Sequence, residues 1–280
     1  MTITSVRYSF AAASDVGCKR ASNEDAFGYS AERGVYLVCD GMGGAAAGEI
    51  ASSMAIEEVL RQLSERSETE AVPLTDVVEE AIRIANQSIL SRAQADLQLN
   101  GMGTTLVGLV TEGSRVLIFN VGDSRCYRLR NLSPEASLAA TPDASPEDNP
   151  DTNPEASPAA TPEQPRLEQI SLDHSLVEEQ VRMGHMTHAE AQRSNYRNVI
   201  TRALGTQPSV APDLFQVEAE PGEIFLLCSD GLTGEVSDEQ IEAMLASDLP
   251  LDELCVRLVD AAKAAGGHDN ITCLLVRAEG

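Results

Sequence analysis

The sequence has no tryptophan, and aromatic residues make up only 4% of its 280 residues. Its core must therefore rest on aliphatic side chains, and a hydrophobic content of 42% is typical of a globular protein. Basic residues are scarce as well, since 20 Lys and Arg face 44 Asp and Glu, a formal net charge of -24. Because such a surface repels phosphate polymers, we expect no nucleic-acid partner and no membrane partner. The negative charge does not argue against a phosphate bound at one local site that carries metal cations.

Long apolar runs are also missing. No stretch approaches the roughly 20 residues that a membrane-spanning helix needs. The first residues, MTITSVRYSF, lack the basic and then apolar pattern of a signal peptide. The six cysteines show no CxxC spacing, and several lie inside apolar runs such as VYLVC and IFLLC, where reduced and buried thiols are expected. These features predict a cytoplasmic protein.

One segment differs in composition from the rest of the chain. Residues 133–165 are rich in Pro, Ala, Ser and acids, and PEASLAATP recurs within them as PEASPAATP. A stretch with so few large apolar side chains cannot offset its ordering entropy, so we predict a disordered insertion without a catalytic part. The flanking runs CYRLR and RLEQIS are strand-like. The insertion is therefore predicted to interrupt a hairpin within one domain of residues 1–280.

Helical and strand-like patterns come in groups along the chain. Strand-like runs neighbour one another and helical stretches are paired, which favours an α+β fold of sheets covered by helices over a regular βαβ alternation. The predicted helices are 45–65, 74–97, 176–183, 187–193, 237–245 and 251–264, and the predicted strands are 104–110, 115–121, 224–228 and 271–276.

Aspartates stand at the ends of several apolar runs: Asp40, Asp123 and Asp230 directly follow such runs, and Asp269 precedes the last one. An acidic pair, Glu24–Asp25, precedes the short run AFGY. Any single Asp-Gly pair is most often a turn, but converging carboxylates would repel one another unless a cation lay between them. Ligands that are all oxygen favour Mg²⁺ or Mn²⁺, and the four histidines form no HxxxH or HExxH set for zinc.

A nucleotide-binding alternative rests on VYLVCD followed by GMGGAA, which is similar to the dinucleotide fingerprint G-x-G-x-x-A. Two features count against it. Asp40 would face a pyrophosphate with like charge, and no second parallel strand ending in an acid follows at the expected place. The glycines are better explained by a close approach of the backbone to a metal, with the Gly41 carbonyl available as a ligand.

Eight short motifs occur in order along the chain. They are SDVGCKRASNED (Ser14–Asp25), VCDGMGG (Val38–Gly44), GMGTT (Gly101–Thr105), VGDSR (Val121–Arg125), DHS (Asp173–Ser175), ITRALG (Ile200–Gly205), CSDGLT (Cys228–Thr233) and GGHDNIT (Gly266–Thr272). Together they closely resemble the bacterial type 2C, metal-dependent protein phosphatases of the PPM family, over nearly the whole chain except 133–165. The resemblance implies a four-layer α-β-β-α sandwich, in which two antiparallel sheets are flanked by helix pairs.

The resemblance also implies a two-metal site. Asp40 matches the aspartate that bridges two Mg²⁺ or Mn²⁺ ions, and Gly41 matches the glycine whose carbonyl binds one of them. Asp230 and Asp269 match ligands of the other ion. No metal-ligand position is substituted, which argues against a catalytically dead member.

Further residues match weaker or substrate-binding positions of the family. Glu24 and Asp25 match the acidic pair that completes the shell of the second ion. Asp123 matches a ligand of a third, weaker ion that shares Asp230. Arg20 matches the arginine that holds the substrate phosphate, a role that suits its planar, bidentate guanidinium.

The implied activity is hydrolysis of phosphoserine and phosphothreonine in proteins, by direct attack of a water that bridges the two ions. The implied catalytic residues are Asp40, Asp230 and Arg20. The expected partners are phosphorylated proteins and a cognate serine/threonine kinase whose action the enzyme would reverse. Two alternatives stay open: a narrow regulatory phosphatase for a phosphorylated anti-sigma-antagonist-type protein, and a silent binding module, against which the complete carboxylates argue.

Residues 175–196 match the mobile flap of bacterial members, with Gly184 between two short helical stretches. His185 and His188 fall in this segment, where packing or exposure is expected and catalysis is not. Two departures from the family stand out. Met42 takes the place of a histidine that animal members often have, so the leaving-group proton has no assigned donor, and QRSNYRN lacks the more usual His-Pro before Arg-Asn.

Overall fold

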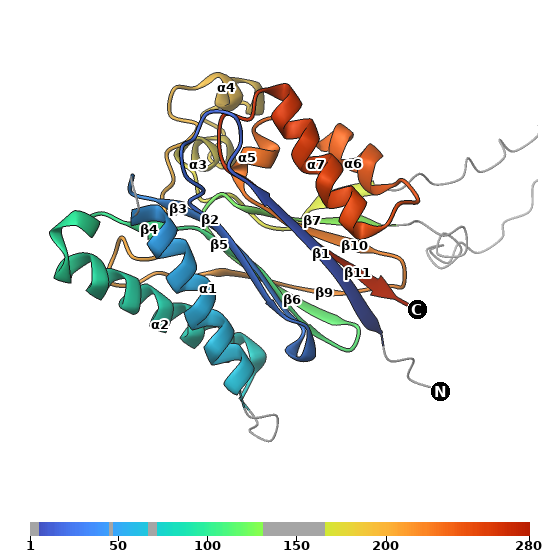
Figure 1. The fold of residues 1–280 in the computed structure, drawn as a ribbon, viewed down its shortest axis with the longest axis horizontal. Coiled ribbons are helices and arrows are strands. Elements are labelled where there is room, and N and C mark those ends of the chain that lie inside the picture. Colours follow the sequence, from blue (N-terminus) through green and yellow to red (C-terminus); the bar gives the residue numbers. More distant parts are fainter. Residues whose placement is uncertain (1–5, 45–46, 67–71, 131–165) are drawn as a thin grey trace, which may run out of the picture.

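The structure is a computed structural model that describes residues 6–44, 47–66, 72–130 and 166–280 (Figure 1). The insertion at 133–165 lies outside the described residues, so its disorder stays a prediction. Within the described ranges, each helix is too short or too polar to cross a membrane.

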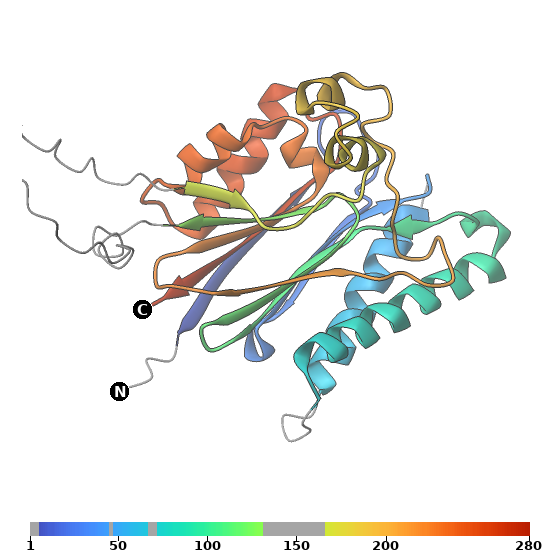
Figure 2. The same ribbon diagram turned by 180° about the vertical axis from the view of Figure 1, so that it is seen from behind.

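Two antiparallel sheets form the centre of the molecule (Figures 1 and 2). In the first sheet the order is β1 (Arg7–Asp15), β11 (Ile271–Glu279), β10 (Ile224–Cys228), β7 (Arg125–Arg130) and β8 (Arg166–Gln169). In the second it is β2 (Asp25–Ser30), β3 (Val35–Met42), β5 (Leu106–Glu112), β6 (Arg115–Val121) and β9 (Asp213–Glu218), and β4 (Gly103–Thr104) pairs with the end of β3.

Helix pairs cover the outer faces of both sheets. α1 (Ala47–Glu65) and α2 (Leu74–Ala95) lie on the second sheet, and α6 (Asp238–Leu245) and α7 (Leu251–Ala265) lie on the first. α7 shows why these segments are helices: its buried side chains recur at helical spacing and form one apolar stripe. The short elements are α3 (Leu176–Arg182), α4 (His188–Arg193), α5 (Asp230–Thr233) and the 3₁₀ turns Ala31–Arg33 and Leu97–Leu99.

Three clusters of buried side chains correspond to the three interfaces between four layers. One lies between α1–α2 and the second sheet, one between α5–α7 and the first sheet, and the third between the two sheets. Aliphatic residues dominate all three, as the scarcity of aromatics requires. The predicted α+β fold and its four-layer α-β-β-α sandwich are therefore confirmed.

The runs that flank the insertion form the predicted hairpin. β7 and β8 pair antiparallel, with Tyr127 opposite Gln169 and Arg130 opposite Arg166. Because these two strands belong to one sheet, the chain leaves and re-enters the same fold on either side of the insertion.

One expected strand needs correction, two strands were missed, and one alternative can be set aside. The strand predicted at 104–110 is interrupted at Thr105, because the backbone N–H of Thr105 donates to the carbonyl of Asp40 instead of continuing the ladder. Strands β1 and β9 were not anticipated, since the small residues of RYSFAAASD and the polar ones of DLFQVE give a weak strand pattern. The dinucleotide-binding alternative is wrong, because β3 has antiparallel neighbours on both sides and no βαβ unit follows it.

Candidate active site

Five aspartates from both sheets meet at one end of the sandwich. Asp25 and Asp40 lie opposite each other in the register of β2 and β3. Asp230 begins α5 directly after β10, Asp123 follows β6, and Asp269 precedes β11. Asp40 interacts electrostatically with all four others, so the strand ends bring these carboxylates together as the sequence predicted.

Burial and mutual repulsion disturb the titration of this cluster. Burial raises the pKa of Asp25 to about 7, an effect that repulsion from Asp230 and Asp269 reinforces and hydrogen bonds from Ser229 and Thr272 oppose. Burial, then repulsion from Asp25 and Asp230, raises the pKa of Asp40 well above its usual range.

The other two buried aspartates behave similarly. Burial and the charge of Asp230 raise the pKa of Asp123 to about 7. Burial and the charge of Asp269 raise the pKa of Asp230, against a hydrogen bond with Asp40 that lowers it. Burying several carboxylates so close together is unfavourable, because they lose hydration and repel one another. Bound cations would offset both effects and stabilise the charged form of the cluster.

The donor set fits hard divalent cations. All its side-chain donors are carboxylate oxygens, and Oδ1 of Asp25 is one of two buried side-chain polar atoms in the described ranges without a hydrogen-bond partner. Within those ranges, no three acidic, histidine or cysteine side chains already surround one point in a metal-binding arrangement. Asp269 instead pairs with an arginine.

That arginine is Arg20, whose Nη2 donates to Oδ2 of Asp269 over 2.6 Å. Its guanidinium is half exposed. The hydrogen bond to Asp269 has the largest effect on the pKa of Arg20 and raises it, and the nearby charges of Glu24 and Asp40 raise it further. Arg20 therefore lies at the mouth of the carboxylate cluster, where an incoming phosphate would meet it.

Glu24 and Gly41 are held against the start of α1. The carbonyl of Glu24 accepts hydrogen bonds from Gly41 N at 3.1 Å and from Ser52 Oγ at 2.6 Å. A Cβ on Gly41 would lie 2.1 Å from the carbonyl oxygen of Gly48, so only glycine allows this close contact. Burial has the largest effect on the pKa of the Glu24 carboxyl and raises it, whereas the charge of Arg20 lowers it.

Three neighbouring polar residues position the ligand-bearing loops. Thr105 Oγ1 accepts from the backbone N–H of Asp40 at 2.8 Å, and Ser229 Oγ donates to Oδ2 of Asp25 at 2.7 Å. Asn270 is buried; its amide donates to the carbonyls of Val16 and Ser22, and its Oδ1 accepts from Glu24 N. No role was predicted for these residues, although all three lie inside the eight motifs and Ser229 and Asn270 each stand beside an aspartate there.

The segment 175–196 contains α3 and α4, close to the two helices expected at 176–183 and 187–193. Ser175 caps α3 by accepting from Glu178 N, and Thr187 forms a capping box with Glu190 at the start of α4. Together with α5 and α6, this segment encloses a pocket of about 640 Å³ whose floor includes Asp123 and Asp230. The expected flap therefore lies beside the carboxylate cluster.

Comparison with known proteins identifies the family. Residues 19–145 match the model of protein phosphatase 2C, and residues 184–279 match that of stage II sporulation protein E. The serine/threonine phosphatase stp of Listeria monocytogenes is 35% identical over 94% of this chain and 92% of its own length. The serine/threonine protein phosphatase PstP of Mycobacterium tuberculosis is 34% identical over 95% of this chain, which matches 44% of the PstP length.

Solved structures agree in fold. A crystal structure of the Mycobacterium tuberculosis phosphatase PstP/Ppp superposes with a TM-score of 0.78, 34% identity and coverage of 98% of this chain and 100% of that one. A structure of the S. agalactiae serine/threonine phosphatase gives a TM-score of 0.80 at 29% identity, over 97% of this chain and 100% of that one. The catalytic domain of PstP has also been solved in complex with two manganese ions, at 32% identity and a TM-score of 0.77 over 98% and 100% of the chains. With its motifs, its sandwich and its carboxylate cluster, this chain belongs to the bacterial, metal-dependent protein phosphatase 2C family.

Proposed function

We propose that this chain removes phosphate from phosphoserine and phosphothreonine in other proteins, using two Mg²⁺ or Mn²⁺ ions. The observation that carries the proposal is the group of mutually repelling aspartates, which both sheets contribute to one partly open site. The two manganese ions in the related PstP domain support the same number here.

The aspartates divide into a core set and an outer set. Asp40 would help to hold both ions, since its carboxylate interacts electrostatically with Asp25 and with Asp230. Asp230 and Asp269 would hold one ion, and the Gly41 carbonyl would contribute to the site from β3. Bound cations of this kind lower the pKa of a water to near neutrality and offset charge on phosphoryl oxygens.

Glu24, Asp25 and Asp123 form the outer set. Asp25 presents an unpartnered, buried oxygen, and Glu24 is fixed by its backbone against α1. Together they would complete the shell of the second ion. Asp123, on the flap side of the cluster and lining the same pocket as Asp230, would hold a third and weaker ion.

Arg20 would orient the substrate. Its half-exposed guanidinium lies against Asp269, and a guanidinium can bind two phosphate oxygens in a bidentate arrangement. The remaining parts of the proposal are finer: the substrates would be those of a cognate serine/threonine kinase, residues 175–196 would act as a flap, and the enzyme would work in the cytoplasm with its six cysteines as free thiols.

The decisive experiment measures phosphate release from a phosphothreonine peptide with Mn²⁺, with EDTA and with the variant Asp230→Ala. We expect release that depends on metal and that Asp230→Ala abolishes. Asp252→Ala, which removes an exposed carboxylate from the first turn of α7, is the matched control and should keep full activity. Folded protein that releases no phosphate with either metal would favour the silent binding module instead.

A further inference from the structure

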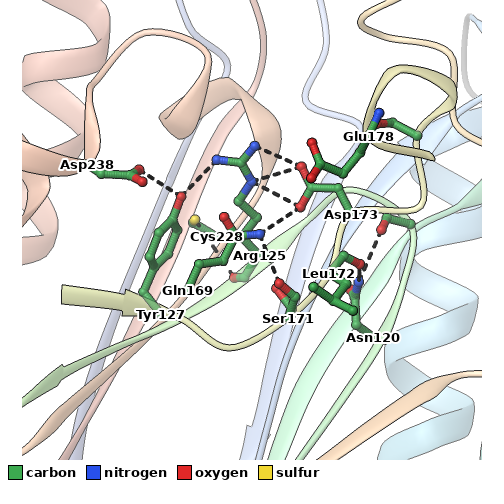
Figure 3. A network of polar contacts seen from close by, with 12 residues as sticks. Asn120, Arg125, Tyr127, Gln169, Ser171, Leu172, Asp173, Glu178, Cys228 and Asp238 are labelled. Atoms are coloured by element: carbon green, nitrogen blue, oxygen red, sulfur yellow. Dashed lines mark hydrogen bonds and ion pairs between the residues drawn. The ribbon is translucent and has the colours of Figure 1, made fainter. Parts of the chain in front are cut away.

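A second arginine, Arg125, lies beside the carboxylate cluster but is bound entirely to the protein. Its Nε and Nη2 donate to both oxygens of Asp173 at 2.8 to 3.1 Å, and its Nη1 donates to the hydroxyl of Tyr127 at 2.8 Å (Figure 3). That hydroxyl donates in turn to Oδ1 of Asp238 at 2.9 Å. All three guanidinium nitrogens therefore have protein partners, unlike those of a phosphate-binding arginine.

The network joins three parts of the molecule. Arg125 begins β7, two residues after Asp123. Asp238 lies in the first turn of α6, on one wall of the 640 Å³ pocket. Asp173 stands two residues before Ser175, the residue that caps α3 at the base of the flap. The Arg125 guanidinium and the Tyr127 hydroxyl, both from β7, thus link the flap base to α6 in a chain of hydrogen bonds.

The flap base has little freedom at Asp173. Its carboxylate is about 10% exposed and also accepts from Gln169 Nε2 at 3.0 Å. The next residue, His174, is fully buried, with Nδ1 accepting from Gly122 N at 3.1 Å and Nε2 facing Asp213 at 3.1 Å. Since Gly122 immediately precedes Asp123, the hydrogen bond between His174 and Gly122 ties the flap base to the loop that carries the Asp123 carboxylate.

We propose that Arg125 is a positioning residue, which sets the spacing between the flap and α6 and thereby shapes the pocket that receives the protein part of the substrate. The inference rests on the proposed function, because it assigns the pocket to a phosphoprotein. Arginine is required by geometry: only a planar fork can bind Asp173 through two nitrogens and Tyr127 through the third. A lysine keeps the charge, but its single nitrogen cannot occupy the positions of all three guanidinium nitrogens.

The test compares Arg125→Lys with Arg128→Lys. Arg128 is the matched control because it also lies on β7 and pairs with a buried carboxylate, Glu223, but it faces the interior between the sheets, away from the pocket. We expect Arg125→Lys to lower kcat/KM for a phosphothreonine peptide by about ten- to a hundredfold. For a small aryl phosphate, which does not fill the pocket, we expect a loss below about threefold by the same reasoning.

A second readout does not depend on activity. If Arg125 holds the flap base, Arg125→Lys should make trypsin cut faster at the exposed Arg193 of the flap and at the exposed Arg197 just after it. Arg128→Lys should leave this rate unchanged at equal global stability. Equal losses on peptide and aryl phosphate, or equal flap cleavage in both variants, would overturn the proposal. A wild-type enzyme inactive on every phosphate ester would refute the proposed function, and the cleavage rates would then still decide whether Arg125 fixes the flap.

Discussion

Arg20 Nη2 lies 2.6 Å from Oδ2 of Asp269, so the proposed phosphate-binding side chain directly contacts a proposed metal ligand. A cation bound at Asp269 would compete with the guanidinium for the same carboxylate. Under the proposed roles, metal loading and the release of Arg20 toward a phosphate would therefore be linked.

Arg20→Ala should raise KM for a phosphothreonine peptide at least tenfold, because a charged bidentate contact is worth roughly 1.5–3 kcal/mol. It should also tighten Mn²⁺ binding, since the competitor for Asp269 is gone. Calorimetric titration with Mn²⁺ and steady-state kinetics measure the two effects. The exposed Arg257→Ala serves as the control; weaker Mn²⁺ binding in Arg20→Ala would contradict the competition.

Asp40→Asn should abolish activity and yet stabilise the metal-free protein. Burial and the charges of Asp25 and Asp230 disfavour the ionised form of Asp40 in the folded state. Asparagine cannot ionise, so we expect a gain on the order of 1–2 kcal/mol in the free energy of unfolding. Urea unfolding in EDTA measures it. With Mn²⁺ added, the wild type should gain stability and the variant should gain little. A variant less stable than the wild type in EDTA would show that the carboxylates do not strain the fold.

The stability of the metal-free protein should fall as pH rises from about 4 to about 7. Asp25 and Asp123 keep their protons in the folded state up to a pKa of about 7, whereas aspartates in an unfolded chain lose theirs near pH 4. The folded state thus binds more protons in this window, and deprotonation favours unfolding. Thermal unfolding in EDTA across this range checks the slope. Asp25→Asn combined with Asp123→Asn should make it shallower, and the remaining slope comes from Asp40 and Asp230, whose pKa values are also raised.

Glu223→Ala should destabilise the protein by roughly 3–5 kcal/mol, because it leaves the charge of Arg128 buried and unpaired. The two side chains are only 4% and 5% exposed, and Arg128 also donates to the carbonyl of Glu218. Activity per folded molecule should be unchanged, since the pair lies away from the site. Chemical denaturation and active-site titration separate the two quantities; a loss of activity in the folded fraction would argue against this separation.

Deleting residues 133–165 should leave activity on a small substrate intact. The deletion keeps Asn131 and Leu132 as a two-residue connection between Arg130 and Arg166, which already face each other across β7 and β8. Two residues are a common length for such a hairpin loop. Hydrolysis of an aryl phosphate and the unfolding midpoint are the measurements. A deletion variant that fails to fold would show that the insertion has a structural part.

Local patterns in the sequence predicted much of the fold. Residues 115–121 form β6 as expected, and the predicted hairpin around the insertion is present. The meeting of the aspartates also followed from the sequence, because carboxylates at the ends of several strands can converge in space when those ends lie at one end of the sandwich. Contacts between distant segments were beyond its reach: nothing local predicts that Arg125 binds Asp173, or that Asn270 clamps the loop before Glu24.

The carboxylates belong to two different sheets: Asp25 and Asp40 lie in strands of one, and Asp230 and Asp269 adjoin the ends of β10 and β11 in the other. Ions shared between these carboxylates would hold the two sheets together at that end of the sandwich. Without metal, repulsion among these carboxylates opposes the hydrogen bonds that join the sheets there, such as that from Ser229 to Asp25, so we expect amides near this end to exchange with solvent by local opening. With metal bound, the same amides should exchange only when the whole molecule unfolds, which makes the cofactor a determinant of folding cooperativity as well as of chemistry.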